Sequence, residues 1–390
     1  MTDNEDLGDV TAEIRHEDPV AAMTRVADAQ PEEEDIGGTE VPLAPDTADN
    51  QSAYLQNIIT TAKNGSREAK IPNGKYYVAQ PGRPGLELSF SDLHAEPPGQ
   101  LSRPNIVGDG MGTTLISGNT PAQPSLKITG GRGIKAHDYI SIKDLSFGNA
   151  TGVTGNGMHI NSSAFIRGES LGFFGKDTGL YLESVLSSEF SHMNFKSCRT
   201  GMYLATGSGF SGINAMRFAR NDFGFCFRWG VHGINIQTNV TFDSCNFEGC
   251  GSDTDPSRMW MGGVALTFDG SQGSVGSNFV GCYFEANKGG FDVQLNNIGN
   301  HYVTHTFVGC NFNRVGNTSF VNNNIRSIGK NRIVLIGCTF DGYGGYQPSQ
   351  WRTYFTDFSA GSPAEVTCIG CHFANRQEQG NLRNINPLTA

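Results

Sequence analysis

One segment, NVTFDSCNFEGC at residues 239–250, recurs along the chain and decides the fold. Each copy ends its apolar pattern on a phenylalanine, which we use as an anchor. The later copies are GSNFVGCYFEAN (276–287), THTFVGCNFNRV (304–315), RIVLIGCTFDGY (332–343) and EVTCIGCHFANR (365–376). Together with four weaker copies upstream, the anchors are Phe147, Phe173, Phe195, Phe218, Phe247, Phe284, Phe312, Phe340 and Phe373. A repeat of 22 to 37 residues is typical of a solenoid, in which each coil stacks on its neighbours.

The positions around each anchor have the two-residue period of a β-strand. The anchor and the residue two before it point to one face, and a second apolar column lies three residues further back, which requires a bend. Another type of strand alternates between the anchors and begins at a glycine: GLYLE (179–183), GMYLA (201–205), GFCFR (224–228), GVALTF (263–268) and GFDVQL (290–295). Helical spacing does not occur in these repeats. The sequence therefore predicts an all-β parallel β-helix with one continuous core.

The cysteines follow the same repeat. Five of them stand two residues before an anchor, namely Cys245, Cys282, Cys310, Cys338 and Cys371. We expect these five to form a buried ladder of free thiols, because a thiol behaves as a small apolar group. Cys198 and Cys250 fall at predicted turns, and Cys226 falls on an outward-facing column. Neither the cysteines nor the histidines have the spacing of metal ligands, so no metal or other cofactor is expected.

The negative charge is concentrated near the N-terminus. Residues 1–45 hold 13 acidic and 2 basic residues, whereas the remaining 345 hold 25 acidic and 26 basic residues. We expect 1–45 to be flexible or bound to another protein, 46–130 to form a cap and the first coils, 131–375 the shaft, and 376–390 a short tail. The body has no basic stripe, which argues against a nucleic-acid ligand. No apolar run suits a membrane helix, so no membrane insertion is expected, and the first residues do not resemble a signal peptide.

The chain after residue 45 carries an ordered set of motifs. Residues 46–65 are predicted to form a short amphipathic helix, and strand–turn–strand segments are predicted at 69–80 and 103–118. The motif residues are Asp46, Thr47, Ile71, Pro72, Gly74, Tyr76, Ile106, Gly108, Gly110, Thr113 and Leu115. In this order they resemble the start of the pectate-lyase-like β-helices, in particular phage tailspikes and capsule depolymerases. The resemblance extends over residues 46–375. It implies a right-handed β-helix, a homotrimer, and attachment of the N-terminal segment to a virion tail or an adaptor protein.

Carboxylates on the outside of the coils are the candidates for catalysis, because the core is filled. The position after each anchor points outward, and its column includes Ala219, Glu248, Glu285, Asn313 and Asp341. Coils lie about 4.8 Å apart, which makes the two glutamates neighbours and places Asp341 two coils beyond. Stacked like charges are unfavourable, and their repulsion favours a proton on one of the two, as a general acid requires. A separation of about 5 Å suits retaining glycoside hydrolysis, and about 6.5–9.5 Å suits inversion.

Further side chains are predicted to contact a substrate. The longest insertion, 251–263, falls between the two glutamates and carries Trp260, a candidate platform for a sugar ring. Each candidate also has a structural interpretation: loop packing or a subunit contact for Trp260, stacked surface rings for the tyrosines, and a solvated position for the glutamates. The predicted contacts are Asp243, Tyr283, Asn313, Trp260, Arg228, Tyr181 and Tyr203.

Three functions fit these features. The first is a tailspike-like virion protein, made in the host cytoplasm, that binds a bacterial capsule or O-antigen and cleaves it as a glycoside hydrolase. The second is a polysaccharide lyase acting by β-elimination, with Lys196, Arg217 or Arg228 neutralising a uronate. The third is a spike that binds its receptor or has a structural role without catalysing a reaction.

Overall fold

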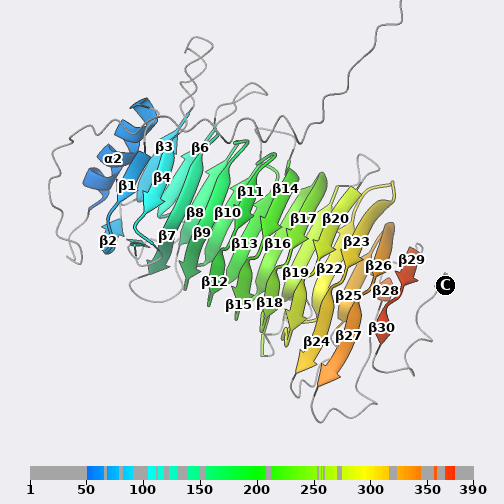
Figure 1. Ribbon diagram of the computed structural model, residues 1–390. Coiled ribbons are helices and arrows are strands. Elements are labelled where there is room, and N and C mark those ends of the chain that lie inside the picture. The colour runs from blue at the N-terminus through cyan, green and yellow to red at the C-terminus, as the bar shows by residue number, and fades with distance from the viewer. Residues whose placement is uncertain are drawn as a thin grey trace, which may run out of the picture. The chain divides into compact units, whose positions relative to one another are not determined.

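A computed structural model describes residues 51–373, except for 66–67, 79–81, 91–103, 111–112, 118–122, 131–138, 150–154, 208–211, 253, 256, 258–259, 270–274, 316–322, 344–354 and 358–364. The described chain is a parallel β-helix with one short helix at its N-terminal end (Figure 1). The acidic segment 1–45, the motif residues Asp46 and Thr47, and the tail 376–390 lie outside the described residues. Among the described residues, no helix is long and apolar enough to span a membrane.

Each coil contributes up to three strands, and every strand pairs in parallel with its counterpart in the next coil. Two long columns of strands form a twenty-stranded sheet: β1 (Glu68–Ile71), β2 (Lys75–Val78), β4 (Asn105–Gly108), β5 (Thr114–Ser117), β7 (Ser141–Asn149), β9 (Arg167–Phe174), β11 (Glu189–Ser191), β12 (Asn194–Lys196), β14 (Asn214–Ala219), β15 (Asp222–Gly224), β17 (Thr238–Asp243), β18 (Asn246–Glu248), β20 (Val275–Val280), β21 (Tyr283–Glu285), β23 (Val303–Val308), β24 (Asn311–Val315), β26 (Asn331–Ile336), β27 (Thr339–Tyr343), β29 (Glu365–Ile369) and β30 (His372–Phe373).

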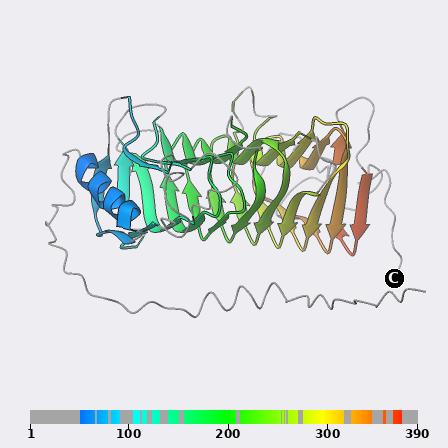
Figure 2. The same cartoon turned by 90° about the horizontal axis from the view of Figure 1, so that it is seen from above.

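The third strand of each coil belongs to a separate sheet. This ten-stranded sheet comprises β3 (Leu86–Ser89), β6 (Leu126–Thr129), β8 (Asn156–Asn161), β10 (Thr178–Glu183), β13 (Thr200–Ala205), β16 (Trp229–Ile236), β19 (Gly262–Phe268), β22 (Phe291–Asn297), β25 (Asn323–Ile328) and β28 (Phe355–Asp357). Helix α2 (Ser52–Gly65) lies at the end of the stack (Figure 2) and buries Leu55 and Ile59, as its apolar spacing predicts. The core therefore runs between the two sheets and is closed at one end by the helix.

Two ladders of phenylalanine rings fill this core. The anchor rings stack with centroids 4.6 to 5.0 Å apart, and the ladder is Phe147, Phe173, Phe195, Phe223, Phe247, Phe284, Phe312 and Phe340. Phe218 is not an anchor, which corrects the prediction for one coil. It belongs to the second ladder, with Phe190 and Phe242, and is the register partner of both. The true anchor is Phe223, so Gly224, and not Ala219, stands in the outward column after it.

The bend between the two ladders is a backbone feature. The residue three before each anchor has a left-handed conformation, for example Ser244 with φ 53° and Gly281 with φ 59°. This residue turns the chain so that the anchor and the residue five before it both point inward. The predicted bend is therefore confirmed, and it separates β17 from β18 and β20 from β21.

The cysteine ladder has the predicted place, and all nine cysteines are free. Four ladder thiols are buried, and Cys371 at the end is half-buried. Each of the four donates to a backbone carbonyl of the preceding coil, as Cys245 does to Phe218 at 3.3 Å and Cys310 to Phe279 at 3.3 Å; the others are Cys282 and Cys338. In the coil of Phe223, Asn221 occupies this position and donates to the Phe190 carbonyl at 3.1 Å. Amide and thiol thus satisfy the same carbonyl position in successive coils.

The prediction for residues 224–228 is wrong. Cys226 is buried and lies between Cys198 and Cys250 in a second thiol column, three residues after the anchors. Residues 225–228 form a corner, and the strand begins only at Trp229. The reason is the left-handed backbone at residue 225, which reverses the parity that a continuous strand would have.

Candidate active site

Glu248 and Glu285 are neighbours on the outside of the twenty-stranded sheet. They end β18 and β21 and are direct partners in the parallel register. The preceding residues, Phe247 and Phe284, stack in the core at 5.0 Å, so strand alternation directs both carboxylates outward. Both side chains are half-buried. The predicted adjacency is confirmed, and the catalytic role of these residues, called the carboxylate pair below, stays a prediction.

Two more predicted residues lie against this pair. Asn313 is the register partner of Glu285 in the following coil, and its amide donates to the hydroxyl of Tyr283 at 2.9 Å. Burial raises the pKa of Tyr283 above its ordinary value, and contact with Glu285 and the charge of Glu248 act in the same direction. Tyr283 therefore keeps its proton and presents a neutral hydroxyl beside the carboxylates.

The register also extends to Asp341. The backbone of Asp341 pairs with that of Asn313, which places it two coils beyond Glu285 in the same column. On the other side of the pair, Gly224 is the partner of Glu248, and the side chain of Lys196 lies over that glycine. The outward column thus reads lysine, glycine, two glutamates and asparagine, and the backbone register continues to Asp341.

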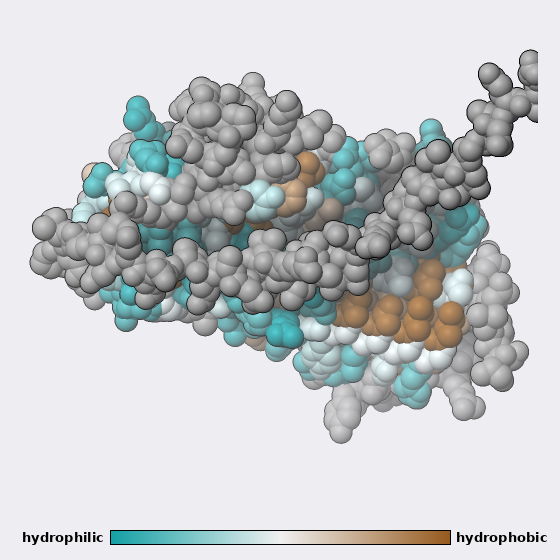
Figure 3. All heavy atoms as spheres, turned by 45° about the horizontal axis from the view of Figure 1, so that its top comes forward, coloured by the Kyte–Doolittle hydropathy of each residue, from teal (hydrophilic) through white to brown (hydrophobic). Residues whose placement is uncertain are grey.

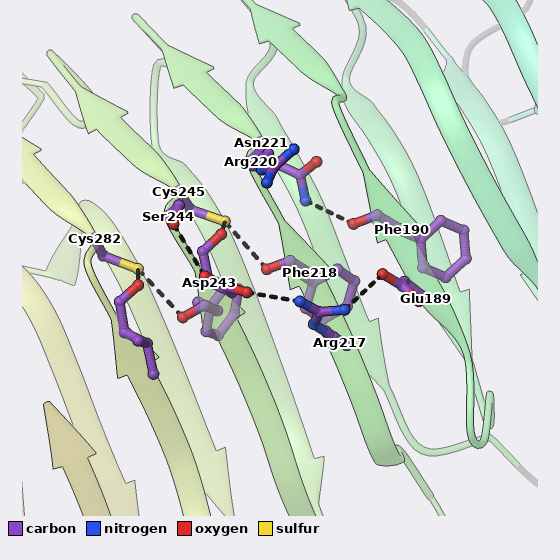
Figure 4. Close-up of polar contacts among 12 residues, drawn as sticks. Glu189, Phe190, Arg217, Phe218, Arg220, Asn221, Asp243, Ser244, Cys245 and Cys282 are labelled. Carbon is purple, nitrogen blue, oxygen red and sulfur yellow. Dashed lines mark hydrogen bonds and ion pairs between the residues drawn. The ribbon is translucent and has the colours of Figure 1, made fainter. Parts of the chain in front are cut away.

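Asp243 serves another interaction. It accepts from Arg217 at 2.7 Å, and Arg217 also donates to Glu189 at 3.0 Å on the opposite side (Figure 4). The hydrogen bond from Arg217 is the main cause that lowers the pKa of Asp243 below its ordinary value. These three side chains form an ion-pair row across β11, β14 and β17. Asp243 is therefore committed to Arg217, and its predicted contact with a substrate stays untested.

Trp260 and Arg228 lie at the corner that leads to the ten-stranded sheet. The ring of Trp260 is 55% exposed and packs with its other side on the Arg326 guanidinium, 4.4 Å from the ring centroid. The indole of Trp229 donates to the Trp260 carbonyl at 2.7 Å, and Arg228 lies 5.9 Å from the Trp229 ring. These contacts attach the end of the 251–261 loop to β16 and β25.

Tyr181 and Tyr203 form the predicted outward pair, but on the ten-stranded sheet. They stand in one column between His159 and His232, with ring centroids 4.3, 5.1 and 5.2 Å apart along the row. Burial raises the pKa of Tyr181 to about 12. His159 stacks flat on Tyr181, whereas the Tyr181–Tyr203 and Tyr203–His232 pairs are tilted by 57° and 55°. The structure does not bring them onto the sheet that carries the carboxylate pair.

Sequence reasoning missed two exposed aromatic residues near the pair. Phe225 and Phe227 are 53% and 50% exposed and stand in the corner that follows Gly224. Both are predicted from the sequence to lie in a strand, and the signal against this is Cys226 between them, which continues the thiol column. The described residues contain no group of three or more His, Cys, Asp or Glu side chains placed to hold a metal ion.

The comparisons with known proteins concern the fold. No protein-family model matches the sequence, and no curated protein matches it significantly. Solved structures do match. The tailspike of Acinetobacter phage vb_AbaP_AS12 has a TM-score of 0.56 at 13% identity, over 85% of this chain and 56% of that chain. The enzymatically active domain of tailspike protein 2 of bacteriophage CBA120 has a TM-score of 0.55 at 13% identity, over 83% of this chain and 46% of that chain.

A third match comes from an enzyme of another kind. The A-module of the mannuronan C-5 epimerase AlgE4 of Azotobacter vinelandii has a TM-score of 0.52 at 11% identity, over 86% of this chain and 93% of that chain. The chain spans about half the length of the two tailspike structures that it matches. At 11% to 13% identity these likenesses show the fold alone, and the fold that they show is a parallel β-helix.

Proposed function

We propose that this protein binds a bacterial surface polysaccharide, capsule or O-antigen, along the outside of β18, β21 and β24 and cleaves it by hydrolysis. The observation that carries the proposal is the in-register carboxylate pair, Glu248 and Glu285, on an outer face that stacked coils make rigid. Two matched tailspike structures are consistent with a polysaccharide ligand and a virion-tail context.

The chemistry follows from the spacing of the coils. Strand partners are about 4.8 Å apart, which suits a mechanism with retention, in which one carboxylate attacks the anomeric carbon and the other protonates the leaving oxygen. The residue that donated the proton, now a carboxylate, then acts as a base. It removes a proton from the water that releases the sugar from the enzyme. The neutral hydroxyl of Tyr283 and the amide of Asn313 stand where they can bind sugar hydroxyls. A reaction that used Glu285 with Asp341, two coils apart, would invert the configuration instead.

The lyase alternative needs a cation free to neutralise a uronate. Arg217 is held by two carboxylates, and Lys196 lies 3.7 Å from Asp222. Arg228 lies against Trp229, at the corner. Two of the three candidate cations are therefore held by carboxylates, and the third lies at the corner. They do not gather at one place to neutralise a uronate, which favours hydrolysis over elimination.

Assembly is part of the proposal. Beyond Asp243, the outward column of β20, β23, β26 and β29 is apolar, and it consists of Val280, Val308, Ile336 and Ile369. Val280 and Ile336 are 41% and 36% exposed, and an apolar band is visible near the C-terminal end of the coils (Figure 3). We propose that this stripe packs against further copies of the chain in a homotrimer, and that residues 1–45 attach the trimer to a tail or an adaptor protein.

The test of hydrolysis uses carboxylate-to-amide variants. Purified capsule or O-antigen is incubated with the intact protein, with Glu248→Gln and with Glu285→Gln, and new reducing ends are measured. Each variant is expected to lose at least about a hundredfold in rate, as expected for removal of general acid or nucleophile. The matched control is Glu189→Gln, an outer-face carboxylate in the ion-pair row. Unchanged cleavage by both pair variants would reject the proposed mechanism, and product with ultraviolet absorbance from an unsaturated uronate would indicate a lyase.

A further inference from the structure

Phe225 has an unfavourable backbone conformation for its size. Its φ is 55°, in the left-handed region, which a bulky side chain rarely adopts. Each corner residue donates its amide to the next coil, to the carbonyl of the residue just before the corner there. The residues at this position in the other coils are all small, namely Gly175, Ser197, Gly249 and Ala286. The side chain is also 53% exposed, so burial in the core does not explain the phenylalanine. A strained residue with an exposed aromatic ring points to a functional constraint.

The ring of Phe225 lies over Gly249, the residue that follows Glu248 of the carboxylate pair. A Cβ built on Gly249 would lie 2.7 Å from Cδ1 of Phe225, which shows that the ring covers this glycine. Gly249 follows Glu248 directly in the chain, and the Phe225 amide donates to the Glu248 carbonyl at 2.8 Å. The ring therefore reaches from its own coil onto the coil of Glu248 and covers the residue that follows this glutamate.

The charges around the ring select the ligand. Asp222, Glu248 and Glu285 project from this part of the sheet, and the one lysine in the same outward column, Lys196, lies 3.7 Å from Asp222. Within the part of the chain that the structure describes, neither Glu248 nor Glu285 forms an ion pair with a cation. A polyanionic chain would be repelled here, whereas a neutral sugar can place its C–H face on an aromatic ring and its hydroxyls on carboxylates.

We propose that Phe225 is the stacking platform for a neutral sugar residue, a hexose or N-acetylhexosamine, that is bound next to the carboxylate pair. The inference rests on the proposed function for the position of the scissile bond, and it adds the residue that binds the sugar and the charge class of the glycan. Gly249 is part of the platform, because any side chain there would displace the ring.

The test measures binding separately from cleavage. The full chain carrying Glu285→Gln, which is expected not to cleave, is applied to immobilised neutral polysaccharides (dextran, mannan and neutral O-antigens) and to polygalacturonate and alginate. Binding to at least one neutral polymer and none to the polyanions is expected. Adding Phe225→Ala is expected to weaken that binding at least about tenfold, which corresponds to about 1.4 kcal/mol. Phe225→Tyr and Phe225→Trp retain a ring and are expected to restore the affinity.

The control is Phe174→Ala, an exposed phenylalanine three coils before Glu248 in the same outward column. Equal affinity of the Phe225→Ala protein, an equal loss in Phe174→Ala, binding to polyanions, or no binding to any neutral polymer would each overturn the inference. Binding that depends on Phe225, without cleavage by the protein that keeps Glu285, would retain the platform and reject the proposed hydrolysis instead.

Discussion

A buried polar chain, Ser277–His305–Asn331, should make the protein sensitive to acid. All three side chains are fully buried. The Ser277 amide donates to Nδ1 of His305 at 3.2 Å, and Nε2 lies 3.1 Å from Oδ1 of Asn331. Because Nδ1 accepts a backbone N–H, the proton of the neutral ring is on Nε2. A second proton, on Nδ1, would face the Ser277 amide, and the Ser277 hydroxyl, 2.9 Å from Nδ1, would have to turn its lone pair to accept it. The charged ring would also have to lie in the core, so the site favours the neutral imidazole.

The size of the effect follows from the pKa. Burial lowers the pKa of His305 to about 4 from 6.5, and the hydrogen bond with Asn331 acts in the opposite direction. Because the folded-state pKa is the lower one, the unfolded chain binds the proton more tightly. The stabilisation is therefore complete above pH 6.5 and is lost as the pH falls toward 4. The loss at pH 4 is about 3 kcal/mol, from 1.36 kcal/mol per pKa unit.

The assay is urea unfolding between pH 7.5 and pH 4, with the free energy of unfolding compared between the intact protein and His305→Gln. The variant should lose about 3 kcal/mol less over this range. His232, whose pKa burial also lowers to about 4, contributes equally to both proteins, so the difference isolates His305. His192→Gln, at an exposed histidine, should behave as the intact protein does. The same pH dependence in His305→Gln would refute this account of the buried chain.

Three further predictions concern the stack and its outer face. Phe284→Ala should lower the free energy of unfolding by about 3–5 kcal/mol, because a fully buried ring is removed from the ladder; a urea titration that showed under 1 kcal/mol would contradict this. Asn221→Ala should lower the free energy of unfolding by about 1–3 kcal/mol, since the buried Met193 amide loses the Asn221 carbonyl that it binds at 2.9 Å, and calorimetry measures the shift. Val308→Lys should give monomers in light scattering, with unchanged circular dichroism, whereas a retained trimer would remove the apolar stripe from the interface.

The sequence was sufficient to predict the architecture because the core repeats. Anchors, thiols and bends recur in most coils, and each copy supports the register of the others. The one misassigned coil shows the limit. Phe218 and Phe223 are five residues apart, which equals the offset between the two ladders, and Asn221 replaces the cysteine that marks the column elsewhere. Either phenylalanine therefore satisfies the pattern, and only pairing with the neighbouring coils decides between them.

The outer face was less predictable, because nothing on it must repeat. Strand parity placed Glu248 beside Glu285, since both follow strong anchors. Parity could not place Trp260, Tyr181 or Tyr203, because the corners of the coil decide which sheet a residue joins. Phe225 escaped prediction for a related reason: its left-handed backbone is a property of the corner, and an aromatic residue is not expected there.

The configuration of the first product formed tests the central claim most directly. Proton magnetic resonance of the anomeric hydrogen, recorded during early cleavage of a neutral host polysaccharide, distinguishes the two stereochemical courses. Two carboxylates on adjacent coils predict that the anomeric configuration is retained, and that Glu248→Gln and Glu285→Gln both abolish the signal. Inversion of configuration, or release of product by either variant at the rate of the intact protein, would contradict the account.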